Sequence, residues 1–409
     1  MTAAGSVERR TRTLEFGIYR DGDNNLDDVQ ARVLNQALET SAADRRVEFT
    51  VEDTTKREGF GPPDGALRTF TYVLRDGTMS GRMDVSAPHD MASRANLARF
   101  VALTLDQAQR SHATQTWIDL VDHGAGDGGG LEADAYRGVM REDDMAAAIA
   151  DGVALHAAAH TEDAGRRVDG VVANQCLMAT LGFASALSHA GVRYLAASPE
   201  TMLAPGVPSG VAADIERHPN DPAAMAKAVV DRVMTTEYGS AAHPFGPAAA
   251  FDVLDLDAEK IGHMESGVAA LNAALGSAAQ DRSARAIVRE DARAIDGMVR
   301  FPHSAGMPWH ADRPALALYD TLAHDGRLGA AVRSAAQNAV AGVRALVLAH
   351  DESDGFAPFG GSDYSDAVGP TVHFPVTPRQ VDAWAPAISE TDNAFYRRVG
   401  GAALAGVLA

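Results

Sequence analysis

Short apolar runs alternate with longer amphipathic segments along the first half of the chain. Runs of Val, Ile, Leu and Phe bounded by turn residues predict strands, and apolar positions that recur every three or four residues predict helices. We expect strands at residues 14–19, 47–51, 69–74, 116–122, 168–173 and 193–197, and helices at 26–40, 91–109, 143–150 and 177–190. Helix-length connections separate most of these strands, so the pattern predicts an α/β fold with a mostly parallel, doubly wound sheet.

After Gly210 the pattern changes, because alanine-rich helical segments dominate. They cover residues 222–236, 257–275, 283–299, 314–322 and 328–346, and strand-like runs return at 344–348 and 371–375. We therefore divide the chain into an α/β core at 10–210, a helical subdomain at 211–340 and a C-terminal segment at 341–409 that returns to the core sheet.

Two reactive side chains follow expected strands. Cys176, the only cysteine of the chain, comes directly after one apolar run and before an expected helix, whose dipole would favour a thiolate. His123 ends another run and precedes a glycine-rich loop. Carboxyl ends of parallel strands meet at one edge of a sheet, so we expect the thiol and the imidazole to lie there together. The alternative is that Cys176 is simply a small buried hydrophobic residue.

The charge balance restricts the partners. The chain has 409 residues, 36 basic and 55 acidic, with a formal net charge of −19. Nucleic acids and anionic membranes are therefore not expected partners, whereas basic peptides are. No run approaches the roughly 18 apolar residues that a membrane-spanning helix needs, and the first ten residues lack the apolar core of a secretory signal. With its single cysteine, the protein is expected in the reducing cytoplasm.

Several motifs occur in an order that is known from one family of enzymes. They are FGIY at 16–19, GDNNL at 22–26, DHGAG at 122–126, NQCLMA at 174–179, LAASPE at 195–200, YSDA at 364–367 and VHFP at 372–375. Together they resemble the clostripain family of cysteine peptidases, which is grouped with caspases, gingipains and legumains. The resemblance implies a caspase-like core, in which a mostly parallel sheet is flanked by helices, with an additional helical subdomain.

The resemblance also implies a mechanism. Cys176 would attack the carbonyl carbon of a peptide bond, and His123 would supply the proton to the leaving amine. The backbone N–H groups of Gly124 and Cys176 would form the oxyanion hole. The separation of 53 residues between His123 and Cys176 fits the caspase pattern of about 50. Asp122 is expected to be structural, since neighbouring strand residues point to opposite faces.

Substrate preference depends on one departure from the family pattern. Family members typically carry an aspartate two residues before the nucleophile, where it selects Arg or Lys at P1, but this chain has Asn174 there. An amide has no charge, so selectivity for basic residues should weaken unless another acid compensates. Glu200 and Asp366 are the candidates to line the pocket. Arg or Lys at P1 remains the expectation.

Family members are often zymogens that are cut between the histidine and the cysteine. Arg137 and Arg141 lie in the loop after His123 and are candidate processing sites, for the enzyme itself or an upstream protease. A cut after Arg137 would leave fragments of 137 and 272 residues, which sum to the 409 of the chain. The alternative is that both arginines are ordinary solvated charges. By analogy with caspase-like peptidases of bacteria, regulated proteolysis is the expected setting.

No cofactor is predicted. The acidic turn that begins at Asp21 fails the EF-hand template, because Leu26 stands where glycine is needed and Arg32 where the bidentate acid should be. Calcium dependence occurs in the resembled family, but no ligand set can be named here. His373 is expected to pack in the core, and His156, His160 and His189 at the surface or between helices. Two other functions stay open: a catalytically silent scaffold or binding protein, and a cysteine hydrolase for a non-peptide amide.

Overall fold

The computed structural model describes residues 12–55, 67–85, 89–133, 138–202, 206–235, 250–295, 312–353, 368–376 and 393–408. The strands are β1 (Leu14–Asp21), β2 (Val47–Thr55), β3 (Arg68–Arg75), β4 (Thr78–Val85), β5 (Gln115–Val121), β6 (Gly130–Ala133), β7 (Gly138–Met140), β8 (Gly170–Asn174), β9 (Tyr194–Ala197), β10 (Ala250–Asp255), β11 (Asp312–Pro314), β12 (Val347–Glu352) and β13 (Thr371–His373). The α-helices are α1 (Asp27–Ala43), α2 (Arg94–Ser111), α3 (Glu142–Ala159), α4 (Leu181–His189), α5 (Val211–Arg217), α6 (Pro222–Val233), α7 (Ala258–Ala278), α8 (Arg282–Ala294), α9 (Ala315–His324), α10 (Ala330–Arg344), α12 (Ala394–Arg398) and α13 (Gly401–Leu408). Short 3₁₀ turns, η1 (Gly126–Gly128) and η2 (Thr161–Asp163), follow β5 and α3.

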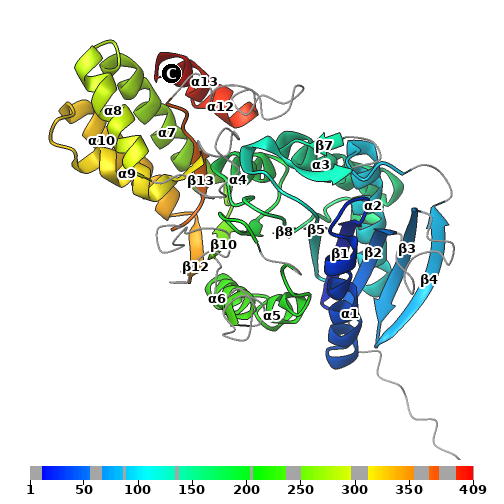
Figure 1. The fold of residues 1–409 in the computed structure, drawn as a ribbon. Helices are drawn as coiled ribbons and strands as arrows, with labels where there is room; N and C mark the ends of the chain where they lie inside the picture. The colour runs from blue at the N-terminus through cyan, green and yellow to red at the C-terminus, as the bar shows by residue number, and fades with distance from the viewer. Residues whose placement is uncertain are drawn as a thin grey trace, which may run out of the picture.

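A nine-stranded sheet runs through the molecule in the order β12-β10-β9-β8-β5-β1-β2-β3-β4 (Figure 1). The five central strands, β9 to β2, pair in parallel. The outer strands β3, β4, β10 and β12 are added by antiparallel pairing. The predicted fold class, a mostly parallel sheet flanked by helices, is confirmed.

The sheet changes its winding direction between β1 and β5. From β1 the chain continues to β2 on one side, and later it returns to β5 and proceeds to β8 and β9 on the other. Ligands of such sheets bind at the carboxyl ends of the strands next to this switch point. The segments that follow β1, β5 and β8 therefore border the expected site.

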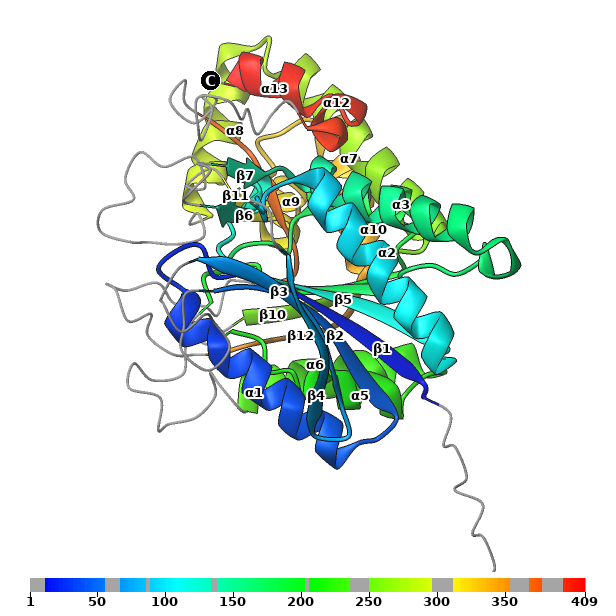
Figure 2. The ribbon, with the colours of Figure 1, turned by 90° about the vertical axis from the view of Figure 1, so that its right-hand side faces the viewer.

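Different helices cover the two faces of the sheet. Helices α1, α5 and α6 lie on one face, and α2 and α3 lie on the other (Figure 2), where α4 joins them in the same core (Figure 1). Amphipathic spacing explains this packing: in α2, Leu97, Phe100, Val101 and Leu105 recur every three or four residues and are buried. Both faces of the central strands are covered, which accounts for their continuous apolar runs.

The second half of the chain differs from the sequence pattern in three ways. Strand β10 was not expected, yet it lies between β9 and β12 in the main sheet. Strand β13 pairs with β11 in a separate two-stranded sheet instead of joining the main one. Helices α5 and α6 pack on the main sheet, whereas α7 to α10 gather at its β12 end (Figure 1). Within the described residues, no helix is long and apolar enough to cross a membrane.

Candidate active site

The ends of β5 and β8 place His123 and Cys176 side by side. The last paired residues of these parallel strands are Val121 and Asn174, and the Asp122 N–H donates to the Asn174 carbonyl at 3.3 Å. His123 and Cys176 are each two residues beyond that pair. They therefore leave adjacent strands at the same level of the carboxyl edge, as the sequence predicted.

Gly124 lies directly against the backbone of Cys176. A Cβ atom at Gly124 would be 2.2 Å from the Cys176 carbonyl oxygen and 3.0 Å from its nitrogen. The Gln175 side chain joins the same two segments, because its Nε2 atom donates to the His123 carbonyl at 3.1 Å. Only glycine permits this approach. Among the described residues, neither the Gly124 N–H nor the Cys176 N–H donates to another residue. Both donors that an oxyanion hole requires therefore have no partner in another described residue.

After Cys176 the chain turns sharply before the helix begins. Leu177 has a φ of 67°, in the left-handed region that β-carbon-bearing residues seldom occupy, and its N–H donates to the Glu200 carbonyl at 2.9 Å. Helix α4 starts only at Leu181, where the Thr180 side chain caps it. The expected helix at 177–190 was therefore too long at its start. The helix dipole, invoked above to favour a thiolate, does not act directly at Cys176.

Cys176 is half-buried beneath the segment around Met202. The Met202 N–H donates to Sγ at 3.3 Å, and Sγ lies 3.8 Å from the Met202 carbonyl oxygen. Burial raises the pKa of the Cys176 thiol above its ordinary value, and the negative charges of Glu200 and Asp122 add to this effect against the Met202 hydrogen bond. In this arrangement the thiol holds its proton at neutral pH.

The imidazole of His123 has a neutral partner. Its Nε2 atom lies 2.7 Å from Oδ1 of Asn25, a residue that follows β1 at the same sheet edge. Since an amide oxygen only accepts, this hydrogen bond requires the proton on Nε2 and leaves Nδ1 as the proton acceptor. Asn25 is part of the GDNNL motif at 22–26, but it was not predicted as a site residue. Its position just after a central strand was the available signal.

Asp122 is directed elsewhere. Its two carboxylate oxygens accept from Nδ2 of Asn24 and from the Glu132 N–H, both at 2.5 Å. Burial and the charge of Asp21 raise the pKa of Asp122 well above its ordinary value. The carboxyl group ties the β1–α1 loop and β6 to the end of β5, which is the structural role expected for it.

Asn174 is buried and its amide is used within the protein. Oδ1 accepts from the Val207 N–H at 2.7 Å, and Nδ2 donates to the Val207 carbonyl at 3.1 Å. The side chain also hydrogen bonds to Asp119, whose pKa burial raises well above the ordinary value. Gly206, with a φ of 93°, packs against the same amide. Asn174 thus anchors the chain at Val207, a role that sequence reasoning missed.

The other predicted site residues are spread over several elements. Glu200 is buried, its Oε2 accepts from the Thr201 N–H at 3.2 Å, and its charge reaches the thiol of Cys176. Arg141 lies between β7 and α3, where its carbonyl accepts from the first turn of that helix. Arg137 and Asp366 lie outside the described residues. The structure therefore brings Glu200 to the thiol and keeps Arg141 in a folded junction.

The loop after His123 is held by a buried polar cluster. Asp127 accepts from the Tyr396 hydroxyl at 2.6 Å, and Nδ1 of His373 lies 2.9 Å from Oδ1 of Asp312. Asp127, Asp312 and His373 offer donor atoms within 4.8 Å of one another and could hold a cation. Burial and the charge of Asp312 raise the pKa of Asp127 to about 7, so a proton is an alternative occupant. His373 thus has a polar environment rather than simple apolar packing.

A cavity of about 320 Å³ opens at the opposite, amino edge of the sheet. Trp117, Tyr194, Arg167 and Arg193 are among the residues that line it. The cavity lies at the amino ends of the strands, whereas Cys176 and His123 follow their carboxyl ends. It therefore has no part in the site described here.

Sequence comparison alone does not place the chain, because no family model and no curated protein matches it. Its structure, in contrast, is similar to a secreted C11 cysteine protease from Bacteroides thetaiotaomicron, "iotapain", with a TM-score of 0.62 and 12% identity over 95% of this chain and 100% of that chain. An inactive zymogen C11 protease from Parabacteroides distasonis gives a TM-score of 0.62 and 16% identity, over 95% and 98% of the two chains. The chain has the fold of the C11 cysteine proteases.

A second structure of the secreted C11 protease from Bacteroides thetaiotaomicron, in complex with an irreversible peptide inhibitor, also matches the C11 fold of this chain. Its TM-score is 0.62 and its identity 11%, over 96% of this chain and 99% of that chain. C11 proteases form the clostripain family, so the resemblance in fold that the ordered motifs predicted is confirmed. At these identities the likeness shows a common fold.

Proposed function

We propose that the chain is a cysteine endopeptidase in which Cys176 is the nucleophile and His123 the proton carrier. The observation that carries this proposal is the placement of both residues two positions beyond the last pair of β5 and β8, with Gly124 against the Cys176 backbone. The N–H groups of Gly124 and Cys176 donate to no other described residue, which supports an oxyanion hole between the two strand ends. Its neighbours in fold are cysteine proteases, which favours a peptide substrate.

The reaction follows from these groups. Nδ1 of His123 takes the thiol proton as Sγ bonds to the carbonyl carbon of the peptide, and the two N–H groups stabilise the oxyanion. The imidazolium then gives the proton to the leaving amine, and the C–N bond breaks. Water, deprotonated by the same imidazole, adds to the thioester, whose S–C bond breaks to release the acid and the thiol.

The uncut chain fits a zymogen. The raised thiol pKa opposes formation of the reactive thiolate, although the Met202 N–H partly offsets this effect, and the segment around Met202 lies over Sγ. Residues 134–137, between β6 and β7, include Arg137, and a cut there would release the loop after His123 from one of its anchors. One fold neighbour is itself described as an inactive zymogen. We therefore favour activation after Arg137 over Arg141, whose backbone begins α3.

Glu200 is the acid proposed to select Arg or Lys at P1. The negative charge of Glu200 helps to raise the pKa of the Cys176 thiol, so Glu200 lies near the reacting atom. Asn174 is neutral, and its amide is hydrogen bonded to Val207. A charged hydrogen bond is worth about 1.5–3 kcal/mol, so Glu200→Gln should reduce the preference for Arg over norleucine by about 10- to 100-fold. Unchanged preference would assign the selection to another residue.

The single thiol makes the decisive experiment simple. The full chain, before and after limited trypsin cleavage, is incubated with an Arg-directed acyloxymethyl ketone, and intact mass is measured. Since Cys176 is the only cysteine, one added label identifies the site without peptide mapping. His123→Ala should abolish labelling, whereas His189→Ala, which removes an exposed histidine paired with Glu265, should not.

The outcomes separate the candidate functions. Labelling that requires His123, together with cleavage of Arg-containing fluorogenic peptides, supports the endopeptidase. Reaction of Cys176 with iodoacetamide alone, with no ketone labelling in either form, would favour the catalytically silent scaffold. Ketone labelling without cleavage of any peptide library member would point to a hydrolase of non-peptide amides.

A further inference from the structure

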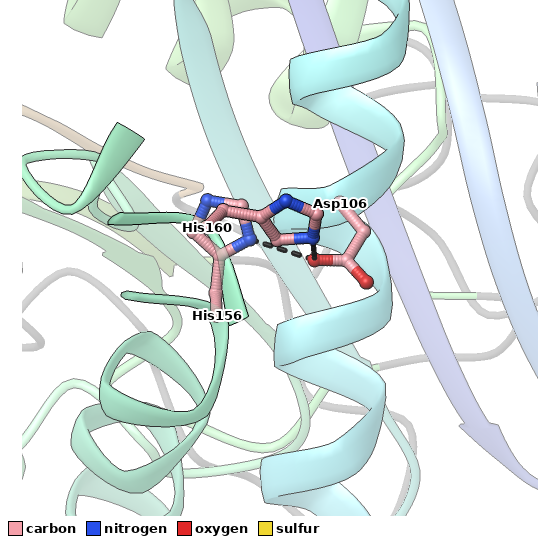
Figure 3. Close-up of side chains that lie close together, drawn as sticks. All are labelled: Asp106, His156 and His160. Carbon is pink, nitrogen blue, oxygen red and sulfur yellow. Dashed lines mark hydrogen bonds and ion pairs between the residues drawn. The ribbon is translucent and has the colours of Figure 1, made fainter. Parts of the chain in front are cut away.

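Two histidines and an aspartate converge at the amino edge of the sheet, away from Cys176. His156 is in the last turn of α3, His160 caps the end of that helix, and Asp106 belongs to the neighbouring α2 (Figure 3). Oδ1 of Asp106 lies 2.7 Å from Nδ1 of His156 and 3.1 Å from Nε2 of His160. Helix α2 ends shortly before β5 begins, and α3 ends before β8 begins, so the cluster lies at the opposite end of these strands from the Cys176 thiol.

We propose that Asp106, His156 and His160 bind a divalent transition metal of the zinc type. A spacing of four residues puts two histidines on one side of a helix, which is the arrangement that zinc-binding helices use. Zinc bonds of about 2.0–2.2 Å in a tetrahedron separate ligand atoms by about 3.3 Å, close to the N···O separations observed here. Imidazole ligands favour zinc, cobalt, nickel or copper over calcium and magnesium.

The surroundings of both imidazoles match those of metal ligands. A ligating histidine usually directs its other ring nitrogen to a carboxylate. Nε2 of His156 lies 3.5 Å from Oδ2 of Asp163, and Nδ1 of His160 lies 3.7 Å from Oε1 of Glu162. Asp163 is in turn held by Arg166. Each ring thus faces Asp106 with one nitrogen and a second acid with the other.

The burial of His156 fits a ligand that is held in one orientation. Its side chain is completely buried, and its Nε2 atom faces Asp163 at 3.5 Å, on the side away from Asp106. In the absence of a metal, the hydrogen bond from Nδ1 of His156 to Oδ1 of Asp106 requires a proton on that nitrogen, and Nε2 of His160 faces the same oxygen. A dication between these atoms would join the three groups through one centre, and the imidazole protons would then lie on the far nitrogens, which face Asp163 and Glu162. The fourth position would be open to water.

The metal would connect parts of the chain that lie on either side of residues 134–137. Asp106 precedes that segment, and both histidines follow it. The site would therefore clamp α2 to α3, two helices that already pack along their length. Its role is to hold the fold together, independent of the function proposed for Cys176.

Zinc titration of the full chain tests this site. Cys176→Ala is used as the background, because the thiol and His123 would otherwise compete for zinc. After chelator treatment and dialysis, calorimetry should show one equivalent of Zn²⁺, and Co²⁺ should give visible absorption of a tetrahedral site. His160→Ala and Asp106→Asn should each weaken zinc binding at least tenfold, and Asp163→Asn by about 10- to 100-fold.

His324→Ala is the matched control, because His324 is an exposed helix-end histidine paired with Asp320 and belongs to no metal-binding group among the described residues. It should leave zinc affinity unchanged. His160 is preferred to the buried His156 as the test position, and circular dichroism verifies that each variant is folded. Zinc should raise the melting temperature of the Cys176→Ala background but not that of its His160→Ala derivative. No binding, or a number of bound Zn²⁺ equivalents that both His160→Ala and Asp106→Asn leave unchanged, would show that the cluster binds no metal.

Discussion

The two edges of the central sheet carry histidines in opposite settings. At the carboxyl edge, His123 is partly exposed and its assigned partner is the neutral amide of Asn25. At the amino edge, His156 and His160 are surrounded by Asp106, Asp163 and Glu162. A neutral partner orients an imidazole without holding it in the charged form, whereas carboxylates favour a bound cation. The difference suits the first setting to proton transfer and the second to metal binding.

The largest expected difference between the two edges comes from replacing a closely packed glycine at each edge by alanine. Gly124→Ala places a Cβ 2.2 Å from the Cys176 carbonyl oxygen, and Gly170→Ala, at the start of β8, places one 2.5 Å from the Trp117 ring. Overpacking should cost each variant about 1–3 kcal/mol in the free energy of unfolding. Displacement of the Cys176 backbone should additionally reduce kcat/KM about 100-fold in Gly124→Ala.

Urea unfolding and peptide hydrolysis of both glycine variants provide the measurement. Gly170→Ala acts as the matched control, since its clash is far from the carboxyl edge. Equal activity losses in the two variants would mean that Gly124 matters only for stability.

The partner of His123 provides the second test. Asn25→Ala removes one hydrogen bond worth about 0.5–1.5 kcal/mol and should lower kcat about 3- to 10-fold. Asn25→Asp gives His123 a carboxylate partner, as His156 and His160 have at the amino edge, so a negative charge then faces the imidazole. It should move the acid limb of the pH–rate profile upward by about one pH unit. Asn24→Ala, which loosens Asp122 instead, should leave the limb where it is. A profile unchanged in Asn25→Asp would contradict the assigned contact.

A smaller expected effect is the pH dependence of stability that comes from Asp21, the buried acid at the end of β1. Burial raises the pKa of Asp21 to about 7, and nearby carboxylates, Asp23 among them, add to the shift. The unfolded chain loses this proton near pH 4, so between about pH 4 and pH 7 the native state binds more protons than the unfolded state. The free energy of unfolding should therefore fall as pH rises through this window.

Asp21→Asn should flatten that dependence, because it cannot lose a proton. The measurement is the urea midpoint at pH 5 and pH 7.5. Asp231→Asn, which alters an exposed carboxylate paired with Lys227, serves as the control and should keep the wild-type slope. If Asp21→Asn also keeps it, the titration belongs to other buried acids.

The sequence allowed the central sheet and the Cys176–His123 pair to be predicted because both depend on local patterns. Apolar runs mark the central strands, and parallel pairing puts their ends together. Strand β10 was missed, since its short run lies among helical segments and only its long-range pairing with β9 makes it a strand. The role of Asn174 was missed for the same reason, because its partner Val207 is 33 residues away in the sequence.

The cluster of His156 and His160 shows another limit of sequence reasoning. The spacing of the two histidines was visible, but a place at the surface or between helices was expected for them, because Asp106 approaches only when α2 and α3 pack together. Likewise, the start of α4 was placed too early because apolar residues continue through the turn at Leu177. Location in the cytoplasm and the processing sites stay predictions.

The segment 134–137 separates an N-terminal part of the chain from a C-terminal part about twice as long, and both parts contribute to the central sheet and to both sites. β5 and α2 come from the N-terminal part, and β8 and α3 from the C-terminal part. If the two parts are made as separate polypeptides, activity must follow second-order association, because each part contributes one member of the Cys176–His123 pair. Dilution should inactivate such an enzyme, and a metal between Asp106 and His160 should lower the concentration at which the two parts combine.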